Sequence, residues 1–174
     1  MARGRPLDVE QELLEEFERN GLVTEYLVSV LPDAIWRLPP PAGRGRTIAA
    51  MVAHIHGVRR TFAKLGGAAA QPPLDRLTVT KSQAQRALRQ STGDLLVLFE
   101  AALSARRARV KGMPRRVVNM LLYLIQHDAH HRGQIFMLAK SLGHEFRGED
   151  VMRVWGWKAL PVGNKRRGAT APAP

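Results

Sequence analysis

The chain has 174 residues, no cysteine and a formal net charge of +12. The lack of cysteine excludes disulfides, thiolate metal ligands, iron–sulfur clusters and a cysteine nucleophile, and it is compatible with a cytoplasmic protein. No apolar run reaches the roughly 18 residues that a membrane span needs, and the N-terminal segment has no apolar stretch typical of a secretory signal. The length predicts a single domain with a sizeable core.

Positive charge is concentrated in two stretches, the segment "RARVKGMPRR" with its preceding arginine and a short run near the C-terminus. Such a charge balance favours attraction to nucleic acid and other polyanions. No aromatic-interleaved RNA motif and no clear helix-turn-helix accompanies it, so we interpret the charge as a solvated surface and do not expect specific nucleic-acid binding. The residues are Arg106, Arg107, Arg109, Lys111, Arg115, Arg116, Lys165, Arg166 and Arg167.

The first two predicted helices lie in the N-terminal part of the chain. One is expected over residues 8–35, with Asn20-Gly21 and Pro32 as points that bend or shorten it. The proline triplet of "RLPPPAGRGR" ends it, since proline cannot continue a helix. The second is expected to begin at the cap residue Thr47 and to continue to about Leu65.

Two further long helices and a short one follow. The third is expected over residues 81–103 with Thr80 as its cap. The fourth opens with Pro114 in its first turn and ends near Leu142-Gly143. The segment "RGEDVMRVWGWKAL" predicts a short terminal helix that carries Trp155 and Trp157.

No strong strand signal and no internal repeat interrupts this pattern. The sequence therefore predicts an all-α protein, a bundle of four main helices with a short extra C-terminal helical segment. We expect the bundle to span residues 1–160. Residues 161–174 are basic and rich in glycine, alanine and proline, which is typical of a disordered tail.

The stretch "LIQHDAHHRGQI" places three histidines within five positions of an apolar run. At about 100° per residue, His131 falls inside the apolar stripe of the fourth helix, His127 lies at its margin, and His130 lies to the other side. Histidines at i and i+4 can converge on one ion, as in metalloprotease helices. The glutamate of the metalloprotease motif is missing here.

The second helix offers a third imidazole in "MVAHIHGVRR". His54 borders the apolar stripe of that helix, whereas His56 points well away from its centre. We therefore expect His54, His127 and His131 to meet in the core as three neutral nitrogen donors with an open coordination position. The alternative is a set of hydrogen-bonded core histidines. We expect His56, His130 and His144 to be surface residues or to support the ligands indirectly.

The stretches "MVAHIHGVRR" and "HDAHHRGQI", with the run H-x-x-x-H-R-G-Q, resemble the DinB/YfiT-like family of metal-binding four-helix bundles over about residues 8–160. The resemblance implies an up-down-down-up bundle with a long connection between the second and third helices, and often a homodimer. It also implies a divalent ion, commonly zinc or nickel, on His54, His127 and His131. Fold and site are similar to those of thiol S-transferases and of a mycothiol-dependent isomerase.

Three residues directly after the histidine pair invite separate expectations. Gln134 lies near the histidine side of the helix, where it either orients a ligand or bound water or makes a helix–helix or dimer-interface hydrogen bond. Gly133 suggests close packing against a neighbouring helix. Arg132 turns away from the ligands and is expected to pair with an acidic residue such as Asp128, or with another subunit.

Three functions remain open at this stage. The first is a metal-dependent hydrolase or thiol transferase acting on a small molecule, with a low-molecular-weight thiol as one candidate; its catalytic residue is unassigned, because neither Asp128 nor Glu145 is placed as a general base. The second is a non-catalytic metal-binding stress-response protein. The third is a nucleic-acid-binding module that uses the basic stretches. Zinc or nickel is expected at the site, although three imidazoles also accept iron or manganese.

Overall fold

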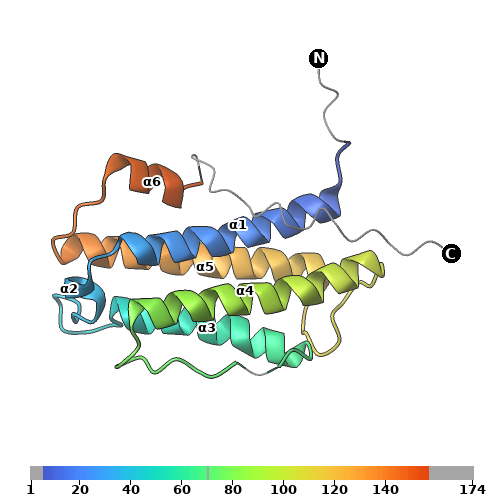
Figure 1. The fold of residues 1–174 in the computed structure, drawn as a ribbon, viewed down its shortest axis with the longest axis horizontal. Coiled ribbons are helices and arrows are strands. Elements are labelled where there is room, and N and C mark those ends of the chain that lie inside the picture. The colour runs from blue at the N-terminus through green and yellow to red at the C-terminus, as the bar shows by residue number, and fades with distance from the viewer. Residues whose placement is uncertain (1–5, 70, 157–174) are drawn as a thin grey trace, which may run out of the picture.

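The fold is entirely helical over the part of the chain that the computed structural model describes, residues 6–69 and 71–156. Four long helices lie side by side and two short ones accompany them (Figure 1). None of the helices in these residues is long and apolar enough to cross a membrane. The helices are α1 Val9–Val30, α2 Asp33–Trp36, α3 Ile48–Leu65, α4 Lys81–Ser104, α5 Val117–Ser141 and α6 Gly148–Val154.

The long helices form a four-sided arrangement in which α1 and α3 each pack against both α4 and α5. The short helix α6 lies on α1, at the opposite side of the bundle from α3 (Figure 1). The connection from α3 to α4 runs back along the bundle (Figure 1). As a result, α3 has α4 on one side and α5 on the other, and the histidines of α3 face different neighbours.

Local capping explains where three of the helices begin. The Asp8 side chain accepts a hydrogen bond from the Gln11 amide at the start of α1, and Thr47 does the same for Ala50 at the start of α3. Thr80 and Gln83 form a reciprocal capping box at the start of α4. These side chains satisfy amides that have no partner within the helix, so the expected starts at Thr47 and Thr80 are confirmed.

Two helix boundaries differ from expectation. The helix expected over residues 8–35 ends at Val30, and Pro32 separates it from α2, whereas Asn20-Gly21 continues α1 without a break. The fourth helix begins at Val117 and not at Pro114, which lies in the preceding turn and accepts a hydrogen bond from Arg109.

The terminal helix is shorter than its sequence segment. Trp155 caps the end of α6 and is exposed. Trp157 and the tail expected over residues 161–174 lie outside the described residues.

The apolar core is divided into two clusters by buried polar side chains. One cluster lies at the α2 end and the other at the α4–α5 connection. Along each of the four long helices, polar residues come between members of the two clusters, and we call these residues the polar layer. The α2-end cluster includes Leu27, Ile48, Met51, Leu88 and Ile135; the other includes Phe17, Ala63, Leu95, Phe99 and Leu124; the polar layer is Asn20, Thr24, Arg59, Thr92 and Asp128.

The α4–α5 connection closes against the end of α3 at a glycine. Gly112 has φ +85°, and a Cβ built there would lie 2.0 Å from the Leu65 carbonyl oxygen. Gly67 has a similar φ of +98°, but a Cβ there meets nothing within 4 Å. Both positions favour glycine for their backbone conformation, and only Gly112 also requires it for space.

We expect Gly112→Ala to lower the free energy of unfolding by clearly more than Gly67→Ala. Gly67→Ala introduces only the left-handed backbone strain, about 1–2 kcal/mol, whereas Gly112→Ala adds a clash with backbone that cannot move aside freely. Urea unfolding of the two variants beside the parent chain measures the difference. Equal losses would contradict the close approach of Gly112 to α3.

Candidate metal centre

The three histidines selected from the sequence lie together between two helices. His54 comes from α3, and His127 and His131 come from successive turns of α5. Their candidate ligand atoms all lie within 4.8 Å of one another. The Nε2 atoms of His54 and His127 are 3.3 Å apart. We call these three residues the histidine cluster.

The donor set of the histidine cluster suits a divalent transition metal. With Zn–N bonds of about 2.0–2.1 Å, two nitrogens at one edge of a tetrahedron lie about 3.3 Å apart. The His54–His127 nitrogen separation matches this value. The cluster therefore could hold a metal ion through three imidazoles, leaving a position for a further ligand.

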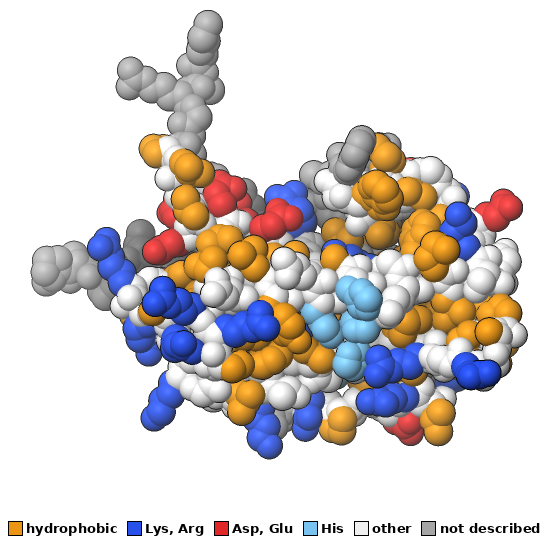
Figure 2. Space-filling model, turned by 180° about the vertical axis from the view of Figure 1, so that it is seen from behind, with side chains coloured by type: hydrophobic (Ala, Val, Ile, Leu, Met, Phe, Trp, Pro, Cys, Tyr) orange, Lys and Arg blue, Asp and Glu red, His pale blue; other side chains and the backbone are white. Residues whose placement is uncertain are grey.

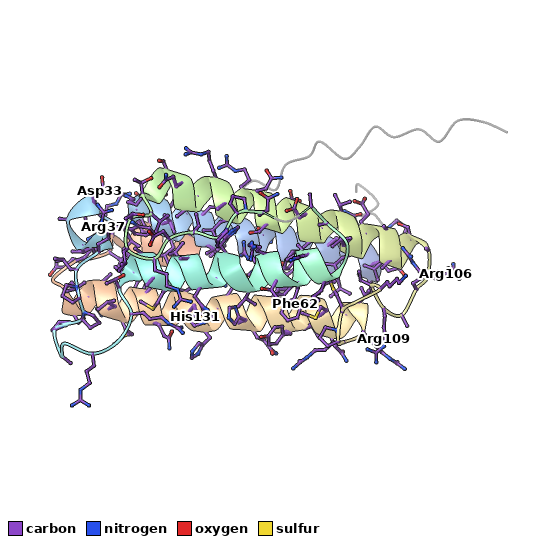
Figure 3. The ribbon with its side chains drawn as sticks, turned by 90° about the horizontal axis from the view of Figure 1, so that it is seen from below. Asp33, Arg37, Phe62, Arg106, Arg109 and His131 are labelled. Atoms are coloured by element: carbon purple, nitrogen blue, oxygen red, sulfur yellow. The ribbon has the colours of Figure 1, made fainter. Side chains whose placement is uncertain are left out.

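The histidine cluster reaches the molecular surface. Figure 2 shows histidine side chains on one face of the molecule, with hydrophobic side chains on one side and Lys or Arg side chains on the other. Figure 3 places His131 along the line where α3 and α5 meet, with Phe62 farther along the same line. His131 is 6% exposed, and His54 and His127 are partly buried. The cluster is therefore partly accessible to solvent from this face.

An aromatic wall that the sequence analysis missed stands beside the cluster. The Tyr123 ring centroid is 6.0 Å from that of His127, and Phe62 meets Tyr123 edge-on at 5.9 Å. The Arg115 guanidinium lies 4.6 Å from the Tyr123 ring centroid. Tyr123 precedes His127 by four residues, so helical spacing alone places it on the same face.

Burial and nearby positive charge favour the neutral form of His54 and of His131. Burial, followed by the charge of Arg46 and by His131 and His127, lowers the pKa of His54 from 6.5 to about 4. Burial also lowers the pKa of His131, although its hydrogen bond to Gln134 acts in the opposite direction. Neutral imidazole is the form that binds a metal, so this environment favours ligation.

Two side chains engage the ring nitrogens that face away from the shared point. The Gln134 carbonyl oxygen accepts from His131 Nδ1 at 2.8 Å, and the Asp128 carboxylate lies 3.4 Å from His127 Nδ1. A partner on Nδ1 leaves Nε2 available for a metal. Of the two roles weighed for Gln134, its hydrogen bond to His131 favours the one in which it orients a histidine of the cluster.

Asp128 is fully buried and belongs to the polar layer. Its carboxylate forms an ion pair with Arg59, whose side chain is also fully buried, at 2.7 Å. Burial raises the pKa of Asp128, but Arg59, together with His127 and Asn20, more than offsets this effect and holds the pKa below its usual value. Asp128 is therefore a buried carboxylate in contact with the cluster.

The other three histidines lie outside the cluster. His130 is exposed, as expected, and its ring lies 5.0 Å from that of His131. His144 is partly buried against Phe146. His56 is only 1% exposed, and its ring contacts the carbonyl oxygens of Ala87 and Pro72 and not the cluster, so the expectation of a surface or ligand-supporting position was wrong.

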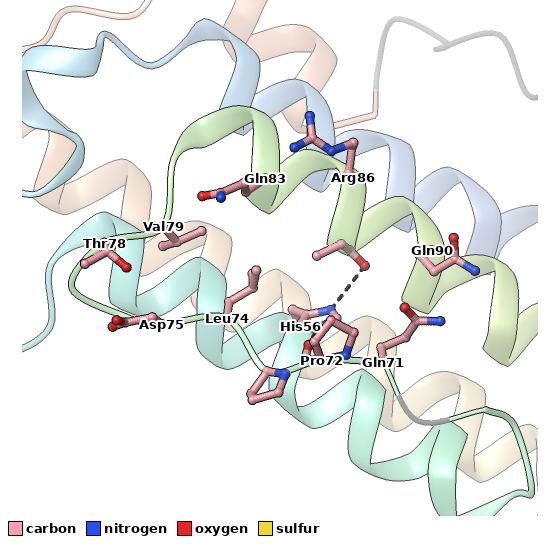
Figure 4. A pocket seen from close by; sticks show the side chains of 12 residues that line it. His56, Gln71, Pro72, Leu74, Asp75, Thr78, Val79, Gln83, Arg86 and Gln90 are labelled. Carbon is pink, nitrogen blue, oxygen red and sulfur yellow. Dashed lines mark hydrogen bonds between the residues drawn. The ribbon is translucent and has the colours of Figure 1, made fainter.

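His56 is buried because α4 and the α3–α4 connection cover it. Its Nδ1 lies 3.1 Å from the Ala87 carbonyl oxygen, and its Nε2 lies 3.1 Å from the carbonyl oxygen of Pro72. It lines a cavity of about 420 Å³ together with Arg86 and Gln90 of α4 (Figure 4). His56 therefore joins the connection to the bundle on the other side of α3 from His54.

The close packing expected at Gly133 and the pairing expected between Arg132 and Asp128 were also wrong, whereas pairing of Arg132 with another subunit stays a prediction. A Cβ at Gly133 would meet nothing within 4 Å, so this glycine is not required by close helix packing. Arg132 donates to Asn20 Oδ1 at 2.6 Å and to Thr24 at 3.0 Å of α1, and not to Asp128. Both neighbours come from a helix distant in sequence, which local spacing does not identify.

The basic stretch that follows α4 is exposed, as expected. Figure 3 places Arg106 and Arg109 at the end of the bundle beyond Phe62, away from His131. Lys165, Arg166 and Arg167 lie outside the described residues.

Comparison with protein families settles the relationship of the chain. Residues 5–161 match the model of the DinB family. The chain belongs to the DinB family. The matched residues include the whole histidine cluster, so the expected family resemblance is confirmed. No curated protein and no solved structure matches this DinB-family chain significantly.

The pKa of His54 generates a prediction for the metal-free DinB-family protein. Its free energy of unfolding should fall as the pH is lowered from about 6.5 to about 4. In this window the unfolded chain takes up a proton at His54 and the folded chain does not, so protonation favours unfolding. Urea unfolding in the presence of a chelator measures the decline.

His54→Gln is the matched variant for this measurement. Its free energy of unfolding should fall less steeply with pH than that of the parent, because the contribution of His54 is removed. Part of the decline should remain, because His131 and His56 also have lowered pKa values. An unchanged slope in His54→Gln would contradict the assignment of the effect to His54.

Proposed function

We propose that this DinB-family protein binds one divalent metal ion. With this ion it acts as a metal-dependent hydrolase or thiol transferase. The observation that carries the proposal is the convergence of His54, His127 and His131 from two helices, with their candidate ligand atoms within 4.8 Å of one another. Three neutral imidazoles are typical of catalytic sites that keep a position open. We propose these three residues as the metal ligands.

The residues of the chain have separable tasks in this proposal. The histidine cluster holds the ion, and Gln134 keeps the Nε2 atom of His131 directed at it. Tyr123 and Phe62 form an apolar wall that shields one side of the site from water. A divalent ion would supply Lewis acidity, which activates a nucleophile or polarises a carbonyl group.

No catalytic base is assigned. Asp128 contacts the cluster, but its Oδ2 atom already accepts hydrogen bonds from Asn20 and Arg59. A fully buried carboxylate with these partners is poorly suited to accept a proton from a substrate. This observation favours chemistry in which the metal itself lowers the pKa of the nucleophile, and a low-molecular-weight thiol is one such substrate.

Several finer features belong to the same proposal. Zinc or nickel is the proposed ion, with iron or manganese as alternatives. The course of the chain in Figure 1 supports an up-down-down-up order of the long helices. We propose a bundle over residues 1–160 with a tail over residues 161–174, a homodimer, and a cytoplasmic location. Specific nucleic-acid binding is not part of the proposal.

Metal content tests the ligand assignment. The parent protein, purified without an affinity-tag metal column, should contain about one equivalent of a divalent metal per chain. His54→Ala, His127→Ala and His131→Ala should each lose most of it, because two imidazoles rarely suffice for a stable site. Elemental analysis measures the content.

His130→Ala is the control, since it removes an exposed histidine of the same helix that lies outside the cluster. It should retain the metal. Retention of metal in all three cluster variants would show that the ligands lie elsewhere.

Turnover distinguishes an enzyme from a non-catalytic metal-binding protein. We expect hydrolysis of an ester or transfer of a thiol by the metal-loaded protein, and we expect His131→Ala to reduce the rate to that of the uncatalysed reaction. The alternative, a non-catalytic stress-response protein, predicts a large loss of thermal stability on chelation with no turnover of either substrate class. Kinetic assays and thermal unfolding, made on the same metal-loaded and chelated samples, separate the two.

A further inference from the structure

The polar layer connects the histidine cluster to all four long helices. Asn20 comes from α1, Arg59 from α3, Thr92 from α4 and Asp128 from α5. Asp128 is in direct contact with the histidine cluster, since its Oδ1 atom lies 3.4 Å from His127 Nδ1. The contacts of this carboxylate therefore bear on how His127 is held.

The two carboxylate oxygens of Asp128 have different partners. Oδ2 accepts from Asn20 Nδ2 at 2.8 Å and from Arg59 Nε and Nη2 at 3.1 and 2.7 Å. Oδ1 is directed to His127 Nδ1. The strong donors on Oδ2 fix the plane of the carboxylate, and Oδ1 is left as an acceptor beside the ring.

The donors to Asp128 are themselves held in place. Arg59 Nη1 donates to Thr92 Oγ1 at 2.7 Å and to the Leu88 carbonyl oxygen at 3.3 Å. Asn20 Oδ1 accepts from Arg132 at 2.6 Å, which orients the amide so that its Nδ2 faces Asp128. The guanidinium of Arg59 and the carboxylate of Asp128 are both fully buried, so water does not compete for these bonds.

We propose that Asp128 is a positioning residue that holds the proton of His127 on Nδ1, so that the Nε2 lone pair points at the shared metal position. Arg59 and Asn20 act through Asp128 by keeping its Oδ1 atom beside the ring. This inference rests on the proposed metal function for its purpose, but the tautomer of His127 is a property of the metal-free protein.

The partners of His127 and His131 differ in a way that supports this role. Asp128 is charged and buried, whereas Gln134 is neutral and exposed. A carboxylate partner fixes the orientation of an imidazole and, through its negative charge, raises the basicity of the imidazole as a ligand.

The tautomer of His127 tests the proposal without any substitution. In the chelated protein, above the pH at which its imidazoles protonate, long-range ¹H–¹⁵N NMR should show the His127 proton on Nδ1 and an unprotonated Nε2. A proton on Nε2 would overturn the proposal. This result is independent of whether the protein uses a metal, so it separates failure of this inference from failure of the proposed function.

Asp128→Asn tests the cause. The amide oxygen should remain with Arg59 and Asn20, which places the amide NH₂ against His127 Nδ1 and forces the ring proton onto Nε2. The NMR signature should therefore switch, and the affinity for Zn²⁺ should fall about 10–100-fold, as is typical when such a partner is lost. An unchanged tautomer and affinity in a folded Asp128→Asn protein would overturn the proposal.

Thr92→Val is the matched control. It removes a buried hydroxyl from the same polar layer at nearly the same side-chain shape, while Arg59 keeps its bonds to Asp128 Oδ2 and to the Leu88 carbonyl oxygen. It should lower stability while leaving the His127 tautomer and the Zn²⁺ affinity within about twofold of the parent, well short of the loss expected for Asp128→Asn. Equal effects of the two substitutions on affinity would mean that the polar layer acts only on stability, and this would also overturn the proposal.

Discussion

The ion pair between Arg59 and Asp128 is the constraint on which the rest of the bundle depends. Both side chains are fully buried, and moving such ions out of water costs several kcal/mol each unless hydrogen bonds replace the lost water. Here Asn20, Thr92 and the Leu88 carbonyl oxygen supply those bonds. Since these partners come from α1 and α4, and the pair itself from α3 and α5, the bundle satisfies the pair only in one relative placement of its four long helices.

This placement also determines the geometry of the histidine cluster. Arg59 follows His54 by five residues on α3, and Asp128 lies between His127 and His131 on α5. A shift of α3 along α5 by one turn, about 5.4 Å, would break the ion pair and separate His54 from the other two rings together. A change of register between α3 and α5 therefore cannot separate the histidines without also breaking the buried ion pair of the core. Fold stability and site geometry rest on the same contacts.

Much of the fold and the cluster could be predicted from the sequence because the signals are local. Caps such as Thr47 and Thr80 lie next to the helices they start, and the spacing of His127 and His131 within one helix determines that they share a face. The remaining features depend on segments distant in sequence. His56 is buried by a connection whose path no periodicity reveals, and Arg132 finds its partners on α1. The burial of Asp128 could not be predicted because a carboxylate away from the apolar stripe is normally solvated, and only the position of Arg59 on another helix explains this burial.

The division of the apolar core into two clusters has a consequence for how the chain tolerates sequence change. Side chains such as Phe17 and Ile48 belong to different clusters, with the polar layer between them. Substitutions at distant sites without shared neighbours add in their effects on stability. The effects on stability of substitutions in the α2-end cluster and in the cluster at the α4–α5 connection are therefore nearly independent. Each end of the bundle can change in sequence without compensating substitutions at the other end.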